Sequence, residues 1–191
     1  MSRPMPTHGL SRDEVLDRLL ETFRARGYDG ASLADLSAAT GLGRSSLYHH
    51  FPGGKEEMAQ EVLARMGRDL ERDLMAPLRA PGAPAARLDA MIAVLDRFYD
   101  SGRKACLLER LCASVDRARF NRSLAATFMN WTEAIVTLCT DAGLAPAEAR
   151  ARAEGAVITV EGALVLAAGL GDPGVYTRAL ERVRAGVLAA P

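Results

Sequence analysis

The segment from residue 32 to residue 55 constrains the fold more than any other part of the chain, because it has the pattern of two short helices joined by a tight turn. Ser32 and Asp35 have the spacing of a capping box, which begins a helix. Gly41 follows the last apolar residue of that helix, at the position where a left-handed terminal residue favours glycine. The chain is therefore expected to turn sharply after Gly41.

The second helix of this pair begins at Arg44 and is barely two turns long. Only Leu47 and Phe51 are placed to be buried, and the other side chains are hydroxyls, imidazoles, a phenol and a cation. A core helix has little use for so many polar groups, whereas the DNA major groove accepts a short helix whose first residues reach the base edges. The pattern therefore indicates a DNA-binding helix-turn-helix.

The sequence GRSSLYHHFPGGKEEM, which begins at Gly43, resembles the recognition helix of TetR-family transcriptional regulators. That helix reads as a small or basic start, Leu-Tyr, two aromatic or histidine residues, Phe, and then a lysine that opens the next helix. Most members place this lysine three residues after the phenylalanine, whereas here Lys55 follows Phe51 by four. The intervening proline and two glycines are similar to the LmrA/YxaF-like branch of the family. The resemblance is specific over roughly the first quarter of the chain and architectural beyond it.

Eight residues are expected to contact DNA: Ser32, Arg44, Ser45, Ser46, Tyr48, His49, His50 and Lys55. Arg44 can donate two hydrogen bonds to O6 and N7 of guanine, and Ser45 and Ser46 are short enough to bond bases or phosphates. The resemblance implies that Tyr48 and His49 touch phosphates or a thymine methyl group.

The remaining contacts are expected on the DNA backbone. The resemblance implies that His50 and Lys55 clamp it, and Ser32 can add a phosphate contact through the N–H groups beside it at a helix N-terminus. These contacts fix the register of the protein on the duplex. For His50, packing against the first helix is the alternative, because a two-turn helix has few exposed faces.

Apolar residues recur with helical spacing along the whole chain, with no alternating strand pattern, internal repeat or heptad run. We therefore expect an all-α fold of nine helices, the TetR-like architecture that the resemblance implies. Residues 1–53 are expected to form an N-terminal arm and a three-helix DNA-binding domain, and residues 54–191 a helical effector-binding and dimerisation domain. A long helix over 54–76 is expected to connect the two and to end before Pro77, where the Pro-rich segment 76–86 breaks it.

The composition excludes several classes of protein. Lys plus Arg equals Asp plus Glu at 24 each, so net charge does not direct the chain to nucleic acid or to a membrane. The chain has three histidines, two in the short polar helix and one in the N-terminal arm, so no histidine-dependent triad or metal cluster can form elsewhere. Phosphate-loop and dinucleotide glycine motifs are missing as well. We expect neither catalysis nor a metal nor a cofactor.

The cellular location is expected to be the cytoplasm. Three cysteines without paired spacing fit a reducing compartment, and the N-terminal residues have no apolar signal-peptide core. The most apolar stretch, residues 155–171, carries Glu161 at its middle and is shorter than the ~20 residues that span a bilayer. It is therefore expected to be a buried helix.

The resemblance implies that the C-terminal part binds a small effector. Pockets between helices are lined mainly by apolar and aromatic groups. Eight residues fit this description: Met91, Leu95, Phe98, Leu108, Phe128, Trp131, Ile135 and Glu161. Trp131 is the strongest candidate because its ring can stack on a ligand and its N–H needs a partner. Glu161 follows, since a carboxylate in an apolar run is costly unless it is paired or used. The alternative is that this stripe is plain core.

The resemblance also implies a homodimer. The last two helices combine small residues with apolar ones, and the candidates for the dimer surface are Val160, Leu164, Val183 and Val187. A two-fold dimer would place two recognition helices on the half-sites of a palindromic operator, about one helical turn apart. A hydrophobic effector that prefers a splayed dimer would then release the DNA, as expected of a repressor.

Two other functions fit parts of the sequence. A helical adaptor could bind a partner protein through its apolar helices, and it would lack sequence-specific binding to a palindromic duplex. A redox-sensing regulator could act through Cys106, which follows Arg103 and Lys104 near a helix start, where a thiolate is favoured.

Overall fold

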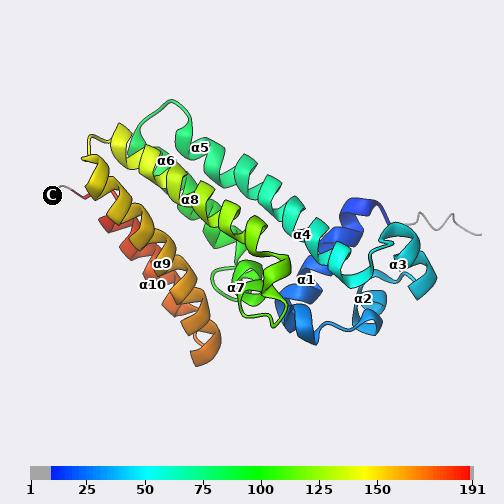
Figure 1. Cartoon of the computed structure of the whole chain (residues 1–191). Coiled ribbons are helices and arrows are strands. Elements are labelled where there is room, and N and C mark those ends of the chain that lie inside the picture. Colours follow the sequence, from blue (N-terminus) through cyan, green and yellow to red (C-terminus); the bar gives the residue numbers. More distant parts are fainter. Residues whose placement is uncertain (1–9, 190–191) are drawn as a thin grey trace, which may run out of the picture.

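The computed structural model describes residues 10–189, and the secondary structure of this part of the chain is entirely helical (Figure 1). The predicted all-α fold is therefore confirmed. The expected N-terminal arm, with His8, lies outside the described residues except for its last position. The helical segments are α1 (Arg12–Gly30), α2 (Leu33–Thr40), α3 (Arg44–His50), α4 (Gly54–Leu70), η1 (Glu71–Met75), α5 (Ala76–Arg79), α6 (Pro84–Phe98), α7 (Leu107–Cys112), η2 (Arg117–Arg119), α8 (Asn121–Asp141), α9 (Pro146–Leu170) and α10 (Gly174–Gly186).

The helix that follows α3 runs further than the sequence predicts. α4, the π-helical turn η1 and α5 form one continuous helical path. Residues 10–189 therefore contain the nine predicted helices when this path counts as one and the short 3-10 turn η2 is not counted. The expected stop before Pro77 is wrong. The backbone N–H of Ala76 donates to the carbonyl of Glu71, five residues back, and this wider turn leads into Pro77, which has no N–H to donate. The Pro-rich break shrinks to residues 80–83.

Two capping boxes set the starts of α1 and α2. The Ser11 hydroxyl accepts a hydrogen bond from the Glu14 N–H, and the Glu14 carboxylate accepts one from the Ser11 N–H. Ser32 and Asp35 do the same at α2. Gly41 ends α2 with a φ of 71°, in the left-handed region that favours glycine. The turn between α2 and α3 is therefore present where the sequence predicts it.

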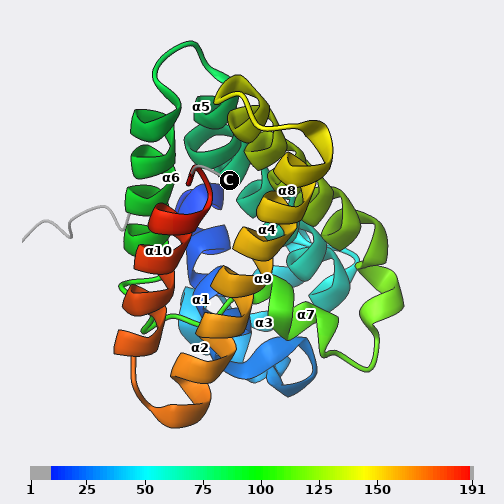
Figure 2. The same ribbon diagram turned by 90° about the vertical axis from the view of Figure 1, so that its left-hand side faces the viewer.

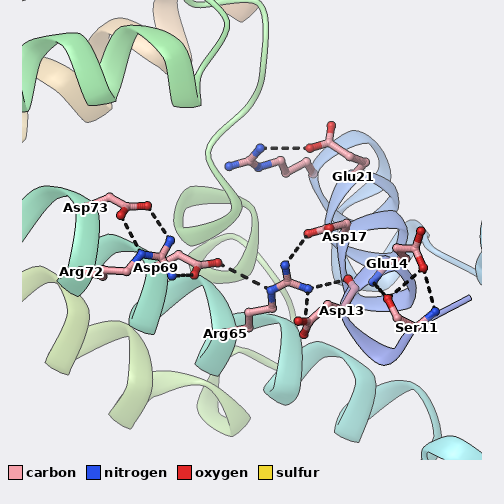
Figure 3. Close-up of polar contacts among 10 residues, drawn as sticks. Ser11, Asp13, Glu14, Asp17, Glu21, Arg65, Asp69, Arg72 and Asp73 are labelled. Atoms are coloured by element: carbon pink, nitrogen blue, oxygen red, sulfur yellow. Dashed lines mark hydrogen bonds and ion pairs between the residues drawn. The ribbon is translucent and has the colours of Figure 1, made fainter.

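A group of ion pairs fastens α1 to α4 (Figure 3). The Arg65 guanidinium lies 3.4 Å from a carboxylate oxygen of Asp13 and 3.1 Å from one of Asp17. On its own helix, it lies 3.6 Å from a carboxylate oxygen of Asp69. The Arg65 side chain is only 22% exposed, so water and salt screen these pairs less than they screen ordinary surface pairs. The group holds α1 on the helix that leads into the rest of the chain.

α8, α9 and α10 pack side by side in the half of the molecule away from α3, and Figure 2 shows α9 and α10 in front. α9 is long and apolar enough to cross a membrane, but the core helices of many soluble proteins have the same length and composition. Here one side of α9 packs against α8 and α10, with Val160 and Leu164 in the shared core. This packing accounts for the buried part of its apolar surface and leaves another part exposed.

α7 ends at Cys112, and the residues that follow it bond to Asp29 of α1 instead of continuing the helix. The Ser114 hydroxyl and the Val115 N–H donate to the two carboxylate oxygens of Asp29, at 3.1 Å and 3.0 Å. These bonds follow the end of α7 directly and leave the Val115 side chain 91% exposed. They also tie the C-terminal end of α1 to the segment between α7 and α8.

Candidate nucleic-acid interface

α3 presents its polar side chains to solvent because two apolar residues hold its other side in the core. Leu47 and Phe51 are fully buried. The exposed side chains of α3 are those of Arg44, Ser45, Ser46, Tyr48, His49 and His50. The structure therefore brings these six predicted residues together on the solvent-facing part of α3, here called the recognition surface.

The start of α3 has free hydrogen-bonding groups. Its N-cap residue is Gly43, which supplies no side-chain hydrogen bond to the first turn. Arg44 makes no ion pair with any residue in the range 10–189. Ser45 and Ser46 are exposed and short, so the Arg44 guanidinium can approach a base edge with little obstruction.

His50 lies on the solvent side of α3, so the considered packing of its side chain against α1 is not observed. Its carbonyl oxygen accepts a hydrogen bond from Arg12 Nη1 at 3.3 Å. The Arg12 guanidinium also lies 4.8 Å from the ring centre of Phe51. Arg12 of α1 thus holds the C-terminal end of α3 through the backbone. The imidazoles of His49 and His50 remain open to a partner.

Lys55 is placed differently from the phosphate contact predicted for it. Its ammonium group donates to the carbonyl oxygens of Tyr28 and Ala31 at 2.9 Å and 3.1 Å. It also lies 4.5 Å from the ring centre of Tyr28. Because two of its three N–H donors are used inside the protein, Lys55 ties the start of α4 to the turn between α1 and α2.

We expect Lys55→Met to lower the free energy of unfolding by about 1.5–3 kcal/mol, because a hydrogen bond from a charged donor contributes roughly that much. Urea denaturation measures this change. The slope of log affinity for duplex DNA against log salt concentration should stay the same, since a positioning residue releases no counterion from the DNA.

Arg150→Met is the matched control for Lys55→Met, because it removes an exposed cation that pairs with Glu133 on the surface. The control should change the stability by less than about 0.5 kcal/mol. An unchanged stability of Lys55→Met together with a salt slope reduced by about one would restore the predicted phosphate contact.

Ser32 is exposed at the N-terminus of α2, but the capping box occupies its hydrogen-bonding groups. Its N–H and its hydroxyl donate to the same carboxylate oxygen of Asp35, at 3.0 Å and 2.6 Å. These bonds hold the pKa of Asp35 below its usual value. Since a carboxylate already sits beside Ser32, a phosphate contact here must use the N–H groups of the next residues.

Thr40 secures the turn of the helix-turn-helix, and the sequence prediction missed it. Its side chain is 1% exposed, and its hydroxyl donates to the carbonyl of Leu36 at 2.8 Å. The same hydroxyl accepts a hydrogen bond from the Leu42 N–H at 3.3 Å. Thr40 thereby links the end of α2 to the chain that enters α3. A threonine directly before the glycine that ends the helix is the sequence signal that could have identified this role.

Most of the predicted effector-pocket residues pack inside the protein. Five are at most 4% exposed and belong to the main core: Met91, Leu95, Leu108, Trp131 and Ile135. Phe98 and Phe128 are partly buried against that core. The Trp131 Nε1 group is buried and has no hydrogen-bond partner among the described residues. The N–H that made Trp131 a candidate therefore still lacks a partner.

Glu161 is partly buried and belongs to a chain of polar contacts with the buried residues Cys106 and Tyr99. The Cys106 thiol donates to Glu161 Oε1 at 3.5 Å, and the Tyr99 hydroxyl donates to Cys106 Sγ at 3.3 Å. Burial raises the pKa of Glu161 to about 7 and the pKa of Cys106 to about 12. The basic residues before Cys106 therefore do not lower the pKa of its thiol, contrary to what the redox-sensing alternative requires. A buried and protonated sulfur removes the physical basis for redox sensing at this residue.

We expect Glu161→Gln to stabilise the protein above pH 7. In the unfolded chain the carboxyl ionises near pH 4.5, whereas burial in the folded chain raises its pKa to about 7. The penalty for burying the ionised carboxylate is thus absent below pH 4.5, grows as the pH rises and is complete above pH 7. Its full size is on the order of 3 kcal/mol.

Chemical denaturation at pH 5 and at pH 8 measures the effect of Glu161→Gln. The parent should lose stability relative to the variant between these two values. Glu154→Gln, which changes an exposed carboxylate of the same helix, should follow the parent. Parallel pH dependence of the parent and Glu161→Gln would contradict the burial of an ionisable carboxyl at this position.

The residues predicted at the dimer surface lie in the core of the chain itself. Val160, Leu164, Val183 and Val187 are at most 4% exposed. They are covered because α9 and α10 pack against each other and α9 packs against α8. Side chains buried in this way have no area left to offer a second copy of the chain.

The apolar side chains exposed on α9 belong to a different face. Ile158 is 70% exposed, Val165 49%, Leu166 56% and Leu170 69%. Their spacing of 7, 8 and 12 residues from the first to the others places them along one side of the helix. We call these four residues the α9 stripe. Exposed apolar patches are typical of interaction surfaces.

Comparison with known proteins covers the helices that form the recognition surface. Residues 15–62 match the family described as "Bacterial regulatory proteins, tetR family". The HTH-type transcriptional regulator LmrA of Bacillus subtilis (strain 168) is 32% identical over 86 residues, 45% of this chain and 46% of that protein. The uncharacterized HTH-type transcriptional regulator YxaF of the same organism is 30% identical over 88 residues, 46% of each chain. The chain thus matches about half the length of these relatives.

A solved structure extends the likeness over the whole fold. The TetR transcriptional regulator from Legionella pneumophila superimposes with a TM-score of 0.81 over 93% of this chain and 97% of that one, at 16% sequence identity. An identity this low shows a shared fold and nothing finer. The similar proteins are transcriptional regulators and not enzymes.

Proposed function

We propose that this chain is a transcriptional regulator of the tetR family, whose pattern residues 15–62 match, and that it represses transcription in the cytoplasm by binding a palindromic operator as a homodimer. α3 enters the major groove, where Arg44 donates to guanine and the two serines after it allow a close approach. A small effector lowers operator affinity when it binds better to a dimer with the recognition helices in another position.

The recognition surface is the observation that carries this proposal. α3 has seven residues, of which only Leu47 is buried, and Phe51 anchors its end. A helix this short, held by its neighbours and polar on the rest of its surface, is suited to a polar partner. Since the chain has no net charge, affinity depends on the local cation Arg44 and on the donors beside it.

The α9 stripe supports the dimer. Two stripes in contact would bury four large apolar side chains from each copy, and Gly162 and Gly169, which are exposed on α9, allow the two helices to approach closely. α9 lies on the side of the bundle away from α3 (Figure 1). A partner on this face therefore leaves both recognition surfaces free for the two half-sites.

The proposed effector is mainly hydrophobic, because the C-terminal helices offer apolar walls with few polar groups. The unpartnered Nε1 group of Trp131 supports a ligand contact on α8. Trp131 is the only tryptophan in the chain, so its fluorescence reports on one place. An effector at this place changes that fluorescence and releases the operator over the same concentration range.

Selection from a pool of random DNA duplexes tests the proposed function. We expect an enriched palindrome whose half-sites lie about one helical turn apart, bound by two copies of the chain. A helical adaptor, the alternative function, would enrich no sequence. That result would end the proposal of a transcriptional regulator.

A further inference from the structure

A cavity of about 480 Å³ lies between α1, the turn after α6, α7 and the C-terminal half of α9. Four cationic side chains line it, together with a single carboxylate from Glu21: Arg24, Arg103, Lys104 and Arg110. α1 and α7 are in contact beside it (Figure 1). The cavity is therefore bounded both by a helix of the DNA-binding half and by helices of the C-terminal half.

Arg24 is the most buried of these cations. Its side chain is 5% exposed, and its guanidinium lies 4.3 Å from the ring centre of Phe98. Nη1 donates to Glu21 Oε1 at 3.1 Å, whereas Nε and Nη2 have no hydrogen-bond partner in the described part of the chain. A buried guanidinium with unused donors is unfavourable unless a further acceptor reaches it. Its surroundings thus supply one carboxylate, that of Glu21, and no acceptor for Nε and Nη2 among the described residues.

The other cations are weakly neutralised as well. Lys104 Nζ lies 3.2 Å from the Glu21 oxygen that Arg24 already uses, so two cations share one carboxylate. Arg110 has its nearest carboxylate oxygen at 3.7 Å, on Glu109, and its Nε group has no hydrogen-bond partner. An anion of the right size would therefore meet several donors at once.

The turn after α6 places two of these cations by an unusual backbone. Asp100, Ser101 and Gly102 are all left-handed, with φ of 48°, 51° and 89°. A Cβ at Gly102 would come 2.6 Å from the Cβ of Tyr176, so only glycine lets the turn lie this close to α10. The turn then delivers Arg103 and the residue after it to the cavity. Left-handed non-glycine residues gathered in this way are typical of functional sites.

Part of the cavity wall is apolar. Leu164, Ala167 and Ala168 of α9 contribute to it. The volume lies within the range of about 300–1,000 Å³ that small-molecule sites occupy. A wall with both cationic donors and apolar side chains suits a ligand that has an anionic group at one end and a hydrocarbon or aromatic body at the other.

We propose that this cavity, which Trp131 does not line, binds a small amphipathic carboxylate as a second ligand of the chain. Its effect on operator binding rests on the proposed function. The ligand carboxylate pairs with Lys104 and Arg110 in the field of Arg24, and the ligand body lies against α9. Glu21 occupies part of this place in the empty protein, because it already accepts from Arg24 and Lys104.

Binding at this site acts on the DNA-binding half through Glu21. The Glu21–Lys104 ion pair joins α1 to the turn after α6. A ligand carboxylate competes with Glu21 for Lys104. When it binds, the ion pair between α1 and the turn after α6 is lost, and contacts between the ligand and the cavity replace it. The ligand therefore favours one placement of α1 over another, and operator affinity changes by that difference.

Isothermal titration with matched pairs of molecules tests the site without DNA. The probes are indole-3-acetate against indole-3-acetamide, and octanoate against octanamide. We expect each carboxylate to bind at least about tenfold more tightly than its neutral amide, because charge-assisted hydrogen bonds require the anion. Equal binding of acid and amide, or no binding of either acid, overturns the proposal.

Three variants locate the binding. The double variant Lys104→Gln/Arg110→Gln should weaken the carboxylates about tenfold, and Glu21→Gln should tighten them, because it removes the competing carboxylate. Arg184→Gln, which changes an exposed cation of α10 paired with Asp89, should bind like the parent. Parent-like binding by the double variant, or weaker binding by Glu21→Gln, places the ligand elsewhere and overturns the assignment.

Three further outcomes complete the test, and the last two separate this inference from the proposed function. Inorganic phosphate that competes fully with octanoate would reveal a simple anion site and would overturn the amphipathic ligand. A protein that selects a palindromic duplex and binds no carboxylate overturns only this inference. Carboxylate binding by a protein that selects no duplex would leave the site standing and overturn the proposed function.

Discussion

Ile158→Arg is expected to dissociate the dimer and to abolish operator binding, although α9 and α3 lie on opposite sides of the molecule. In a single chain the Ile158 side chain is 70% exposed, so the substitution should leave folding nearly unchanged. In the proposed dimer it would bury an unpaired charge, which costs roughly 3–5 kcal/mol. Sedimentation velocity measures the loss of dimer, and titration with the selected duplex measures the loss of binding.

Met129→Arg is the matched control for Ile158→Arg, because Met129 is an equally large apolar side chain, 65% exposed on α8. It should remain dimeric and bind operator like the parent. Val160→Arg should instead unfold the protein, since Val160 is fully buried in the chain's own core. A dimeric Ile158→Arg protein with normal operator affinity would contradict the assignment of the α9 stripe to the dimer.

Arg44→Ala is expected to remove most of the preference for one operator sequence. A bidentate arginine–guanine contact discriminates against the wrong base by about 1–3 kcal/mol, or roughly 5- to 150-fold. Affinity for the selected operator should therefore fall by this factor at each half-site. Affinity for a duplex with that guanine replaced should fall much less, because the lost contact was already missing. Fluorescence anisotropy with both duplexes measures the difference.

Arg44→Lys separates charge from geometry at the same position. Lysine keeps the positive charge but lacks the planar fork that pairs with both acceptors of guanine. The salt dependence of binding should stay close to that of the parent, while the preference for guanine weakens. A parent-like preference in both Arg44 variants would show that another residue of the recognition surface reads the bases.

Local signals predicted the helix-turn-helix because its chemistry is local. The capping pair Ser32 and Asp35, the left-handed Gly41 and the anchors Leu47 and Phe51 all occupy the predicted places. Caps, turn residues and apolar spacing act within a few residues, so a sequence carries them in full. Once Leu47 and Phe51 are known to be buried, the helical spacing predicts that the other six residues of α3 are exposed.

Long-range contacts explain where the sequence misled. The apolar spacing of α7 extends in the sequence to Val115, but the helix ends at Cys112, and the Val115 N–H donates to Asp29 of α1 instead of to a helical carbonyl. A lysine ammonium group can donate hydrogen bonds to a backbone carbonyl or to a phosphate. The position of Lys55 in the sequence therefore could not show that it bonds to the carbonyls of Tyr28 and Ala31. Pro77 is accommodated in a helical segment because the turn before it is a wider π turn. No residue type predicts a π turn from sequence.

The exposed face of α9 could not be predicted from the sequence, for a different reason. Its apolar residues surround the helix, with Val160 and Leu164 on one side and Ile158 and Leu166 on another. An amphipathic pattern identifies a buried face only when the other face is polar. The sequence therefore indicated that α9 has an interface, whereas only the packing of α8 and α10 reveals which side remains open.

Photo-crosslinking from α3 into the selected operator tests the central claim most directly. A benzophenone side chain in place of Ser45, which is exposed on the recognition surface, should crosslink to bases in both half-sites of the palindrome. The same group in place of Glu181, exposed on α10, should give no crosslink to DNA. Operator that is bound tightly, yet never crosslinks from position 45, would contradict DNA reading by α3.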